Sequence, residues 1–331
     1  MIHPFGRKYT GPKSLPIDPT YGDSEGAKLQ QAMLDGDWAT TQMLLEAATE
    51  PEDLTFLVNV ASQVAGCEDW LPEVARSASD PTLPLLVHGA RAVVWAWEAR
   101  TNTQAKYVGK ERFAVFFERL ARAEGCLQPV VRRAPDNVVA WYWLMKASRS
   151  RQRGVTETRR RFEEVASRCP GHLQAHQQML QQLSRKWGGS HDEMHTFATT
   201  AMHKALAGSP LGMLVAEAHL ERWLDFRTGL IDVRGRHQAR AYIRSSNVLT
   251  ALHEAADLSV RHPDYQRHPR TGPIVHGTFA LAFSLAGDQA AAAEQFRLTD
   301  NVVTQFPWSY ASGLNPARGF CRRQARAFAR A

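Results

Sequence analysis

The chain has 331 residues, of which 44% are hydrophobic and 22% are charged, so it has ample apolar material to bury a core. No run of about 18 uninterrupted apolar residues occurs, which argues against a membrane-spanning helix. The net charge of +7 is a modest excess for this length and does not predict general nucleic-acid binding.

The N-terminal segment, residues 1–22, is predicted to be an extended arm. It contains four prolines, Pro4, Pro12, Pro16 and Pro19, and lacks the apolar stretch of a signal peptide. Four cysteines lie far apart in the chain without a Cys-x-x-Cys pair: Cys67, Cys126, Cys169 and Cys321. This dispersal favours reduced, buried thiols and predicts a cytoplasmic location.

Residues 23–80 are expected to form a group of N-terminal helices. Leu29–Ala48 has the pattern of a helix pair interrupted at Gly36-Asp37. Pro81 and Pro84 separate this group from the middle of the chain. We expect helical repeats over residues 81–315 and a basic C-terminal helix or tail over residues 316–331.

The middle of the chain has helical periodicity and no alternating, Val/Ile/Thr-rich strand pattern. In Asn137–Ser150, one stripe contains Val139, Trp143 and Ala147. Arg153-Gly154 interrupts the pattern, and a second helix is predicted to end at Cys169-Pro170, because proline cannot continue a helix. Residues 136–170 are therefore predicted to form one helix–turn–helix unit.

This unit recurs along the chain. Pro135, Pro170 and Pro210 each close a helical stretch, at spacings of 35 and 40 residues. The second interval is longer because Lys186-Trp187-Gly188-Gly189-Ser190 widens a turn. Ser190 and Glu193 have the spacing of a capping box, which predicts a helix from about residue 191 to residue 206. A further pair is expected over residues 276–307, turning at Gly287-Asp288.

These units resemble the tetratricopeptide superfamily, whose repeat period is about 34 residues. In residues 276–307 the family's apolar positions are occupied by Phe279, Phe283, Ala292 and Phe296, whereas His276 and Thr299 depart from its pattern. The resemblance is degenerate over much of residues 24–315. The Lys-Trp-Gly-Gly-Ser turn also looks like a feature of a bacterial family of helical proteins of unknown function. The resemblance implies an all-α solenoid of stacked antiparallel helix hairpins and no particular activity.

Three stretches do not fit the repeat. Residues 76–84 are expected to be a separator, and residues 230–238 and 261–272 are expected to be loops, because Gly235, Pro263 and Pro269 interrupt the helical patterns there. Such loops are either binding elements or spacers.

No catalytic residue or cofactor is predicted. The chain has no G-x-S-x-G motif, no phosphate-binding glycine loop and no cysteine in a catalytic context. Two histidine pairs have the four-residue spacing of helical metal ligands: His172 with His176, and His191 with His195. The glutamate of the zinc-protease motif is not in its place, so surface or interhelix histidines are preferred. A metal at His191 and His195 is the weaker alternative.

The leading hypothesis is a non-enzymatic protein that binds a peptide or protein partner in the groove of a helical superhelix. Trp95 and Trp97 are two residues apart and cannot share a helix face, and the same is true of Trp141 and Trp143. One tryptophan of each pair is expected in the core and the other beside the groove. The candidate partner-binding residues are Trp97, Asn137, Trp141, Lys146, Arg149, His172 and Gln178.

Two other functions stay open. An enzyme, or a biosynthetic accessory, could use a pocket inside the helical stack, with acid–base or metal chemistry from Glu98, Arg100, Asp192, Glu193, His195 and Glu217. The C-terminal region has no acidic residue after Asp300 but contains Arg318, Arg322, Arg323 and Arg326. A solvated helix is the preferred interpretation of this basic end, and binding of an acidic partner, a phosphate or RNA is the alternative.

Overall fold

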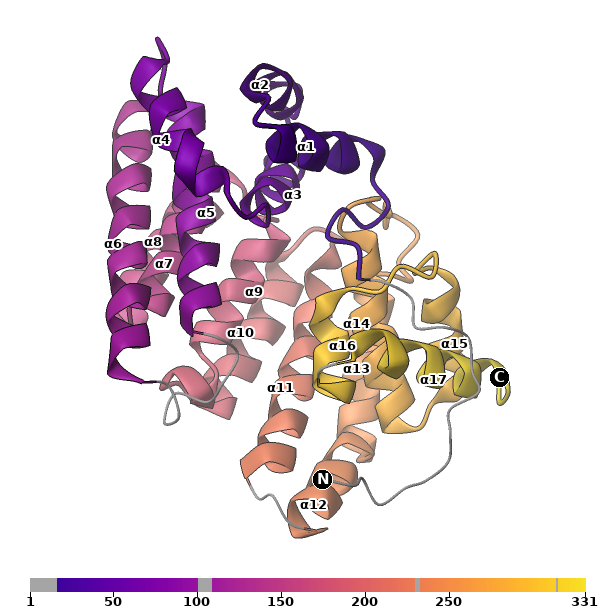
Figure 1. The fold of residues 1–331 in the computed structure, drawn as a ribbon. Coiled ribbons are helices and arrows are strands. Elements are labelled where there is room, and N and C mark those ends of the chain that lie inside the picture. Colours follow the sequence, from indigo (N-terminus) through magenta and orange to yellow (C-terminus); the bar gives the residue numbers. More distant parts are fainter. Residues whose placement is uncertain (1–16, 101–108, 230–232, 314) are drawn as a thin grey trace, which may run out of the picture.

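The computed structural model describes residues 17–100, 109–229, 233–313 and 315–331 (Figure 1). All regular elements in these ranges are helical, which confirms the all-α prediction. Most of the predicted N-terminal arm, residues 1–16, lies outside the described residues. No helix of the described ranges is long and apolar enough to cross a membrane, and the four cysteines are free thiols.

The first part of the chain forms α1 Ser24–Asp35, α2 Trp38–Glu46, α3 Pro51–Ser62, α4 Cys67–Ser77, α5 Thr82–Arg100 and α6 Lys110–Arg133. The predicted break between α1 and α2 is confirmed. Gly36 ends α1 in the left-handed conformation, where glycine has no Cβ to clash. Asp37 then caps α2 by accepting a hydrogen bond from the Thr40 backbone N–H.

The middle part forms α7 Val138–Ser150, α8 Gly154–Arg168, α9 Leu173–Gln182, the short 3₁₀ helix η2 Arg185–Trp187, α10 His191–Lys204, the 3₁₀ helix η3 Pro210–Gly212 and α11 Met213–Gly229. The unit predicted over residues 136–170 is α7 and α8. The predicted start of this helix is confirmed, because Ser190 caps α10 by accepting from the Glu193 N–H, and its hydroxyl also donates to the Glu193 carboxylate at 2.9 Å.

The last part forms α12 Val233–Ile243, α13 Ser246–Leu258, α14 Gly272–Ala286, α15 Gln289–Arg297, α16 Gln305–Ser312 and α17 Pro316–Phe328. The loop predicted over residues 230–238 is wrong from residue 233 onward, where α12 begins. Its charged side chains lie on an exposed face, while Ala239 and Ile243 are buried. Residues 261–271 connect α13 to α14 without regular helix, as expected.

Neighbouring helices pack as hairpins, notably α5 with α6, α7 with α8 and α14 with α15. The helices follow one another from α5 and α6 on the left of Figure 1, through α7, α9 and α11, to α14–α17 on the right. α7 contacts α9, which in turn contacts α11. The N-terminal helices α1–α3 lie across the top of this row.

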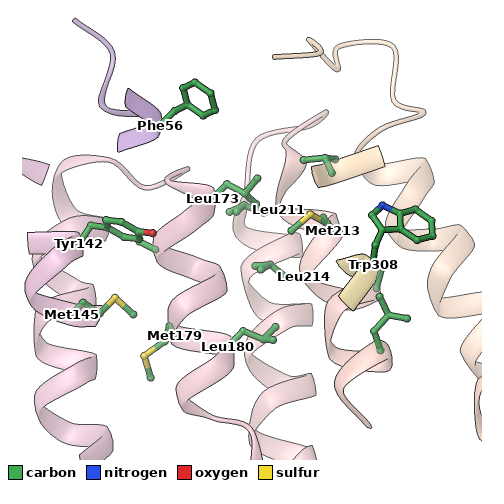
Figure 2. Packing of buried hydrophobic residues seen from close by; sticks show 14 of the residues in the cluster. Phe56, Tyr142, Met145, Leu173, Met179, Leu180, Leu211, Met213, Leu214 and Trp308 are labelled. Carbon is green, nitrogen blue, oxygen red and sulfur yellow. The ribbon is translucent and has the colours of Figure 1, made fainter. Parts of the chain in front are cut away.

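The apolar core continues from one helix pair to the next. Figure 2 shows Tyr142 on α7, Met179 on α9 and Leu214 on α11 in successive helices, with Trp308 of α16 beyond them. All four side chains are nearly inaccessible to solvent. Burying a large apolar side chain contributes about 2 kcal/mol, so this shared core holds the helices against one another.

A cluster of ion pairs joins the N-terminal helices to the segment that precedes α14. Arg270, which precedes α14, donates to Asp53 on α3 at 2.8 Å and to Asp23 before α1 at 3.1 Å, and it also contacts Glu25 at 2.5 Å. The Arg270 side chain is only 8% exposed. The N-terminal helices are therefore held against the segment that leads into α14.

The turn over residues 186–190 has a structural role at each position. Trp187 packs edge-on against Trp97, with ring centroids 6.2 Å apart. Gly188 has a φ of +91°, in the left-handed region. A Cβ on Gly189 would collide with the backbone carbonyl group of Leu183, and Ser190 caps α10. The two glycines are thus required by different constraints, one by backbone conformation and one by space.

Candidate functional site: a central cavity

The described part of the chain forms a partly open central cavity of about 780 Å³ between α3, α7, α9, α11 and α16. Ligand pockets in proteins have volumes of about 300–1,000 Å³, so this cavity is large enough for a bound molecule. The residues that line it are Ile17, Pro19, Tyr21, Phe56, Asn59, Gln63, Tyr142, Arg149, Gln174, Gln177, Gln178, Gln181, Glu217, Arg270, Thr271, Ile274, Gln305, Phe306 and Tyr310.

Helix periodicity explains why these side chains converge. On α7, Tyr142 and Arg149 are seven residues apart, which is close to two turns, so both point from the same face. On α9, the same spacing separates Gln174 from Gln181, with Gln178 between them. Each inner helix therefore presents one polar stripe to the cavity and buries its apolar residues against other helices.

One wall of the cavity consists of side-chain amides. The Asn59 side-chain amide donates to the side-chain oxygen Oε1 of Gln174 at 2.5 Å, and the Tyr142 hydroxyl donates to the same oxygen at 3.3 Å. Gln178 differs, because its Oε1 atom is buried and has no hydrogen-bond partner among the described residues. Buried polar atoms nearly always have a partner, so this oxygen is an unsatisfied acceptor in the cavity wall.

Glu217 lies on the α11 side of the cavity and is 1% exposed. Its carboxylate accepts hydrogen bonds from Gln177 and Gln181, each at 2.9 Å. Burial raises the pKa of Glu217 to about 7, and the two amide hydrogen bonds oppose that rise only in part. Glu217 is therefore close to half protonated near neutral pH.

Two cations on α7 lack an acidic partner among the described residues. The Nε atom of Arg149 is buried and makes no hydrogen bond, and its guanidinium lies 5.0 Å from the ring centroid of Trp187. The Lys146 ammonium lies 3.7 Å from the ring centroid of Trp143. Burial lowers the pKa of Lys146 to about 7 and also lowers the pKa of Arg149. Cation–π contacts compensate only part of this lost hydration.

A hydrogen-bonded cluster closes the cavity near α16. The Tyr310 hydroxyl donates to Glu221, and Lys186 donates to the same carboxylate at 2.8 Å. Burial, together with the charges of Glu221 and Glu217, raises the pKa of Tyr310 well above its usual value. The negative charges of this cavity therefore lie on α11, whereas the unpaired positive charges lie on α7.

The remaining wall is largely apolar. It is formed by Phe56 on α3, Tyr21, Ile274 at the start of α14 and Phe306 on α16. Tyr21 packs against Phe56 with ring centroids 5.7 Å apart. Arg270 lies over the Phe56 ring at 5.4 Å, so the ion-pair cluster described above also borders the cavity. A bound molecule would meet amides and cations on one side and aromatic rings on the other.

The structure brings together part of the predicted partner-binding set. Arg149 and Gln178 line the cavity, and Lys146 lies one turn from Arg149 on α7. Trp97 lies in a seam between helices, where its Nε1 donates to Ser150 at 3.0 Å. No observation tests whether these residues bind a partner, so that assignment stays a prediction.

The other three predicted binding residues have structural contacts. Asn137 caps α7, accepting from the Ala140 N–H at 2.9 Å. Trp141 is partly buried and donates from Nε1 to the Pro135 carbonyl at 2.8 Å, while its neighbour Trp143 is in the core. His172 is fully buried, caps α9 and lies 2.9 Å from the Thr55 hydroxyl.

The acid–base set that would support an enzyme does not converge. Glu98 pairs with Arg91 at 2.7 Å, Glu193 belongs to the capping box, and His195 lies 3.3 Å from the Tyr242 hydroxyl. Of the set, only Glu217 lines the cavity. Burial lowers the pKa of His195 to about 4, so this imidazole is neutral near pH 7.

The weaker metal alternative receives no support from the geometry. The Nε2 atom of His191 lies 3.0 Å from Asp225, and His195 packs against His219. Within the ranges that the structure describes, no group of three or more His, Cys, Asp or Glu side chains is arranged to hold a metal ion.

Several cavity residues were not among the predicted ones, although the sequence has a signal for some of them. The segment 172–183 contains Gln174, Gln177, Gln178 and Gln181, which share one side of a helix. Only Gln178 was singled out. Asn59 and Tyr310 have no such signal, because they come from distant helices and reach the cavity through tertiary packing alone.

Comparison with protein-family models, with curated proteins and with solved structures gave no match to this chain. The resemblance to tetratricopeptide repeats therefore rests on the residues quoted above. The central cavity is therefore the feature from which a function is inferred.

Proposed function

We propose that this chain is a non-enzymatic binding protein that holds a short peptide segment of a partner, through a carboxylate, in the central cavity. In this proposal the helix hairpins stack as in tetratricopeptide solenoids, and the cavity is part of their inner groove. The main support for this proposal is that the Nε atom of Arg149 is buried without a hydrogen-bond partner among the described residues.

A carboxylate from a partner would remove the cost of this unpaired charge. A guanidinium can hold a carboxylate through two parallel hydrogen bonds, and such charge-assisted bonds are stronger than neutral ones. Lys146 lies one turn away on α7, but burial lowers its pKa to about 7 and it does not line the cavity, so Arg149 is the main cation available to the ligand. The expected ligand therefore has a free C-terminal carboxylate, or an acidic side chain, directed at α7.

The amide wall fits a peptide main chain. An extended peptide presents both N–H donors and carbonyl acceptors, and each glutamine or asparagine side chain offers both groups in return. Gln178 has an unused acceptor, and Gln174 and Asn59 lie beside it in the cavity lining. The aromatic wall, with Phe56 and Phe306, would contact an apolar side chain of the same segment.

The enzyme hypothesis is less favoured. Glu217 alone, with a pKa near 7, could exchange a proton. However, the cavity does not place a second predicted acid or base beside it, and general acid–base chemistry needs positioned partners. Glu217 is more simply described as a hydrogen-bonding residue that orients Gln177 and Gln181.

A peptide-display screen with free C-termini tests the proposal. The best binder should lose about tenfold or more in affinity when its terminus is amidated or when the protein carries Arg149→Gln, because either change removes one charge-assisted contact. Arg159→Gln on the exposed face of α8 is the matched control and should bind normally. Failure to select any saturable binder, or equal binding by Arg149→Gln, would contradict the proposal.

A further inference from the structure

A second groove, distinct from the central cavity, lies where α12, α14 and α17 meet the end of α11. It has a volume of about 540 Å³. Six arginines line it, and no aspartate or glutamate does so among the described residues. They are Arg227, Arg236, Arg240, Arg244, Arg323 and Arg326.

The groove is a tertiary feature and not a property of the basic C-terminus alone. Arg227 comes from α11, Arg236 and Arg240 from α12, and Arg323 and Arg326 from α17. Of the four arginines predicted as a basic tail, only these last two line the groove, while Arg318 and Arg322 do not. The positive charges therefore converge from three separate helices on one concave site.

Neutral groups hold two of these arginines in place. Arg323 donates to the Ser284 hydroxyl at 3.2 Å, and Arg227 donates to the Tyr310 carbonyl at 3.2 Å. None of the six forms an ion pair with a carboxylate of the described residues. The guanidinium groups of Arg323 and Arg227 are thus oriented, and none of the six is neutralised by a carboxylate of the described residues.

Burial is the main cause, and neighbouring arginines a smaller one, of the lowered pKa of two arginines in this groove. Burial, followed by the charges of Arg227, Arg322 and Arg326, lowers the pKa of Arg323 to about 10. Burial and the charges of Arg240 and Arg326 also lower the pKa of Arg244. Like charges this close are unfavourable unless an anion lies between them.

We propose that this groove binds a small anion that carries two or more phosphate groups. Six arginines and no lysine favour phosphate, because a guanidinium matches two phosphate oxygens at once. A concave site of this volume can surround a compact polyanion, whereas a nucleic-acid backbone requires cations spread along a track. The shared chemistry of inorganic polyphosphate and of a nucleoside triphosphate defines the ligand class.

Titration calorimetry of the full chain with inorganic tripolyphosphate tests this proposal. We expect one saturable site and, in Arg240→Gln/Arg326→Gln, about tenfold weaker binding, because two charge-assisted contacts are lost. Both side chains are exposed, so the variant should fold. The control Arg234→Gln/Arg330→Gln removes the same amount of charge from exposed positions, but neither residue lines the groove, and binding should stay within about twofold.

Further ligands identify the source of the phosphates and can overturn the proposal. ATP binding as tightly as tripolyphosphate, with AMP much weaker, would support a nucleotide; tripolyphosphate binding tighter than ATP would support a free polyphosphate. An equal loss of tripolyphosphate affinity in the two double variants would indicate general charge attraction and would contradict binding in the groove. Tighter binding of single-stranded RNA of about 12 nucleotides, lost in Arg240→Gln/Arg326→Gln, would assign the groove to nucleic acid instead.

Discussion

Arg270 donates a hydrogen bond to Asp53 at 2.8 Å across a separation of 217 residues in the chain. The same guanidinium also contacts Asp23 and Glu25. It is the centre of a network in which one cation satisfies three carboxylates. Asp53 and Glu25 are partly exposed, so solvent screens part of this interaction.

Replacing Arg270 by methionine should lower the free energy of unfolding by about 2 kcal/mol, because it leaves three carboxylates close together without their cation. Urea denaturation measures the change. Arg168→Met is the matched control. Arg168 pairs with Asp136, which is 95% exposed, and with Glu164 on its own helix, which is 32% exposed, so its loss should cost less than about 1 kcal/mol. Equal losses of unfolding free energy in the two variants would show that the Arg270 network stabilises the protein no more than an exposed ion pair does.

Arg149→Met is expected to stabilise the isolated protein by about 1 kcal/mol or more. The substitution removes a partly buried charge whose Nε has no partner among the described residues, and it keeps a side chain of similar length that can pack against Trp187. The midpoint of urea unfolding should rise with an unchanged m-value. On the exposed face of α8, Arg159→Met should change stability by less than about 0.5 kcal/mol. Destabilisation by Arg149→Met would mean that the native protein already satisfies this guanidinium.

The stability of the protein should depend on pH through Glu217. Its pKa rises from 4.5 to about 7 on folding, so the native state binds more protons than the unfolded state between these values. Stability due to this group is therefore present below about pH 4.5 and is lost as the pH rises toward 7, by up to about 3 kcal/mol.

The matched variant for this prediction is Glu217→Gln, which cannot ionise. The difference in unfolding free energy between the variant and the unmodified protein should shift in favour of the variant as the pH increases from about 4.5 to 7. Comparing the two proteins cancels the contribution of Glu52, whose pKa burial also raises to about 7. A difference that does not vary with pH would show that Glu217 titrates normally.

Gly189→Ala should destabilise the protein by about 3 kcal/mol, because the added Cβ would collide with the backbone of Leu183, which cannot move aside as a side chain can. Gly188→Ala should cost only about 1 kcal/mol, the strain of placing a Cβ in the left-handed region. Thermal or urea unfolding of both variants checks the order. A larger effect at Gly188 would show that backbone conformation, and not space, decides this turn.

Local patterns in the sequence were sufficient for most of the helices. Gly36-Asp37, Gly287-Asp288 and the Ser190–Glu193 box all mark boundaries that the structure has at the same places. The α12 region was predicted as a loop because Gly235 and several charged residues leave too few apolar positions there for a clear helical periodicity. Burial of Ala239 and Ile243 is sufficient for a helix there once neighbouring helices cover them.

The site was less predictable than the fold. Arg149 and Gln178 were selected for their chemistry, and both line the central cavity. Asn137 and His172 were selected on the same grounds but cap helices, a role that their positions just before apolar periodic segments could have indicated. The raised pKa of Glu217 could not be predicted, because it depends on burial by helices distant in the sequence.

The contact of Arg270 with the first helices has a consequence for how the chain unfolds. In a row of hairpins that touch only their neighbours, either end can fray without disturbing the rest. Here, opening the first helices also exposes the segment before α14, because Asp23 and Asp53 are bound to it. We therefore expect amide hydrogen exchange in α1–α3 and in the start of α14 to slow or accelerate together, and a single cooperative transition in place of progressive melting from the ends.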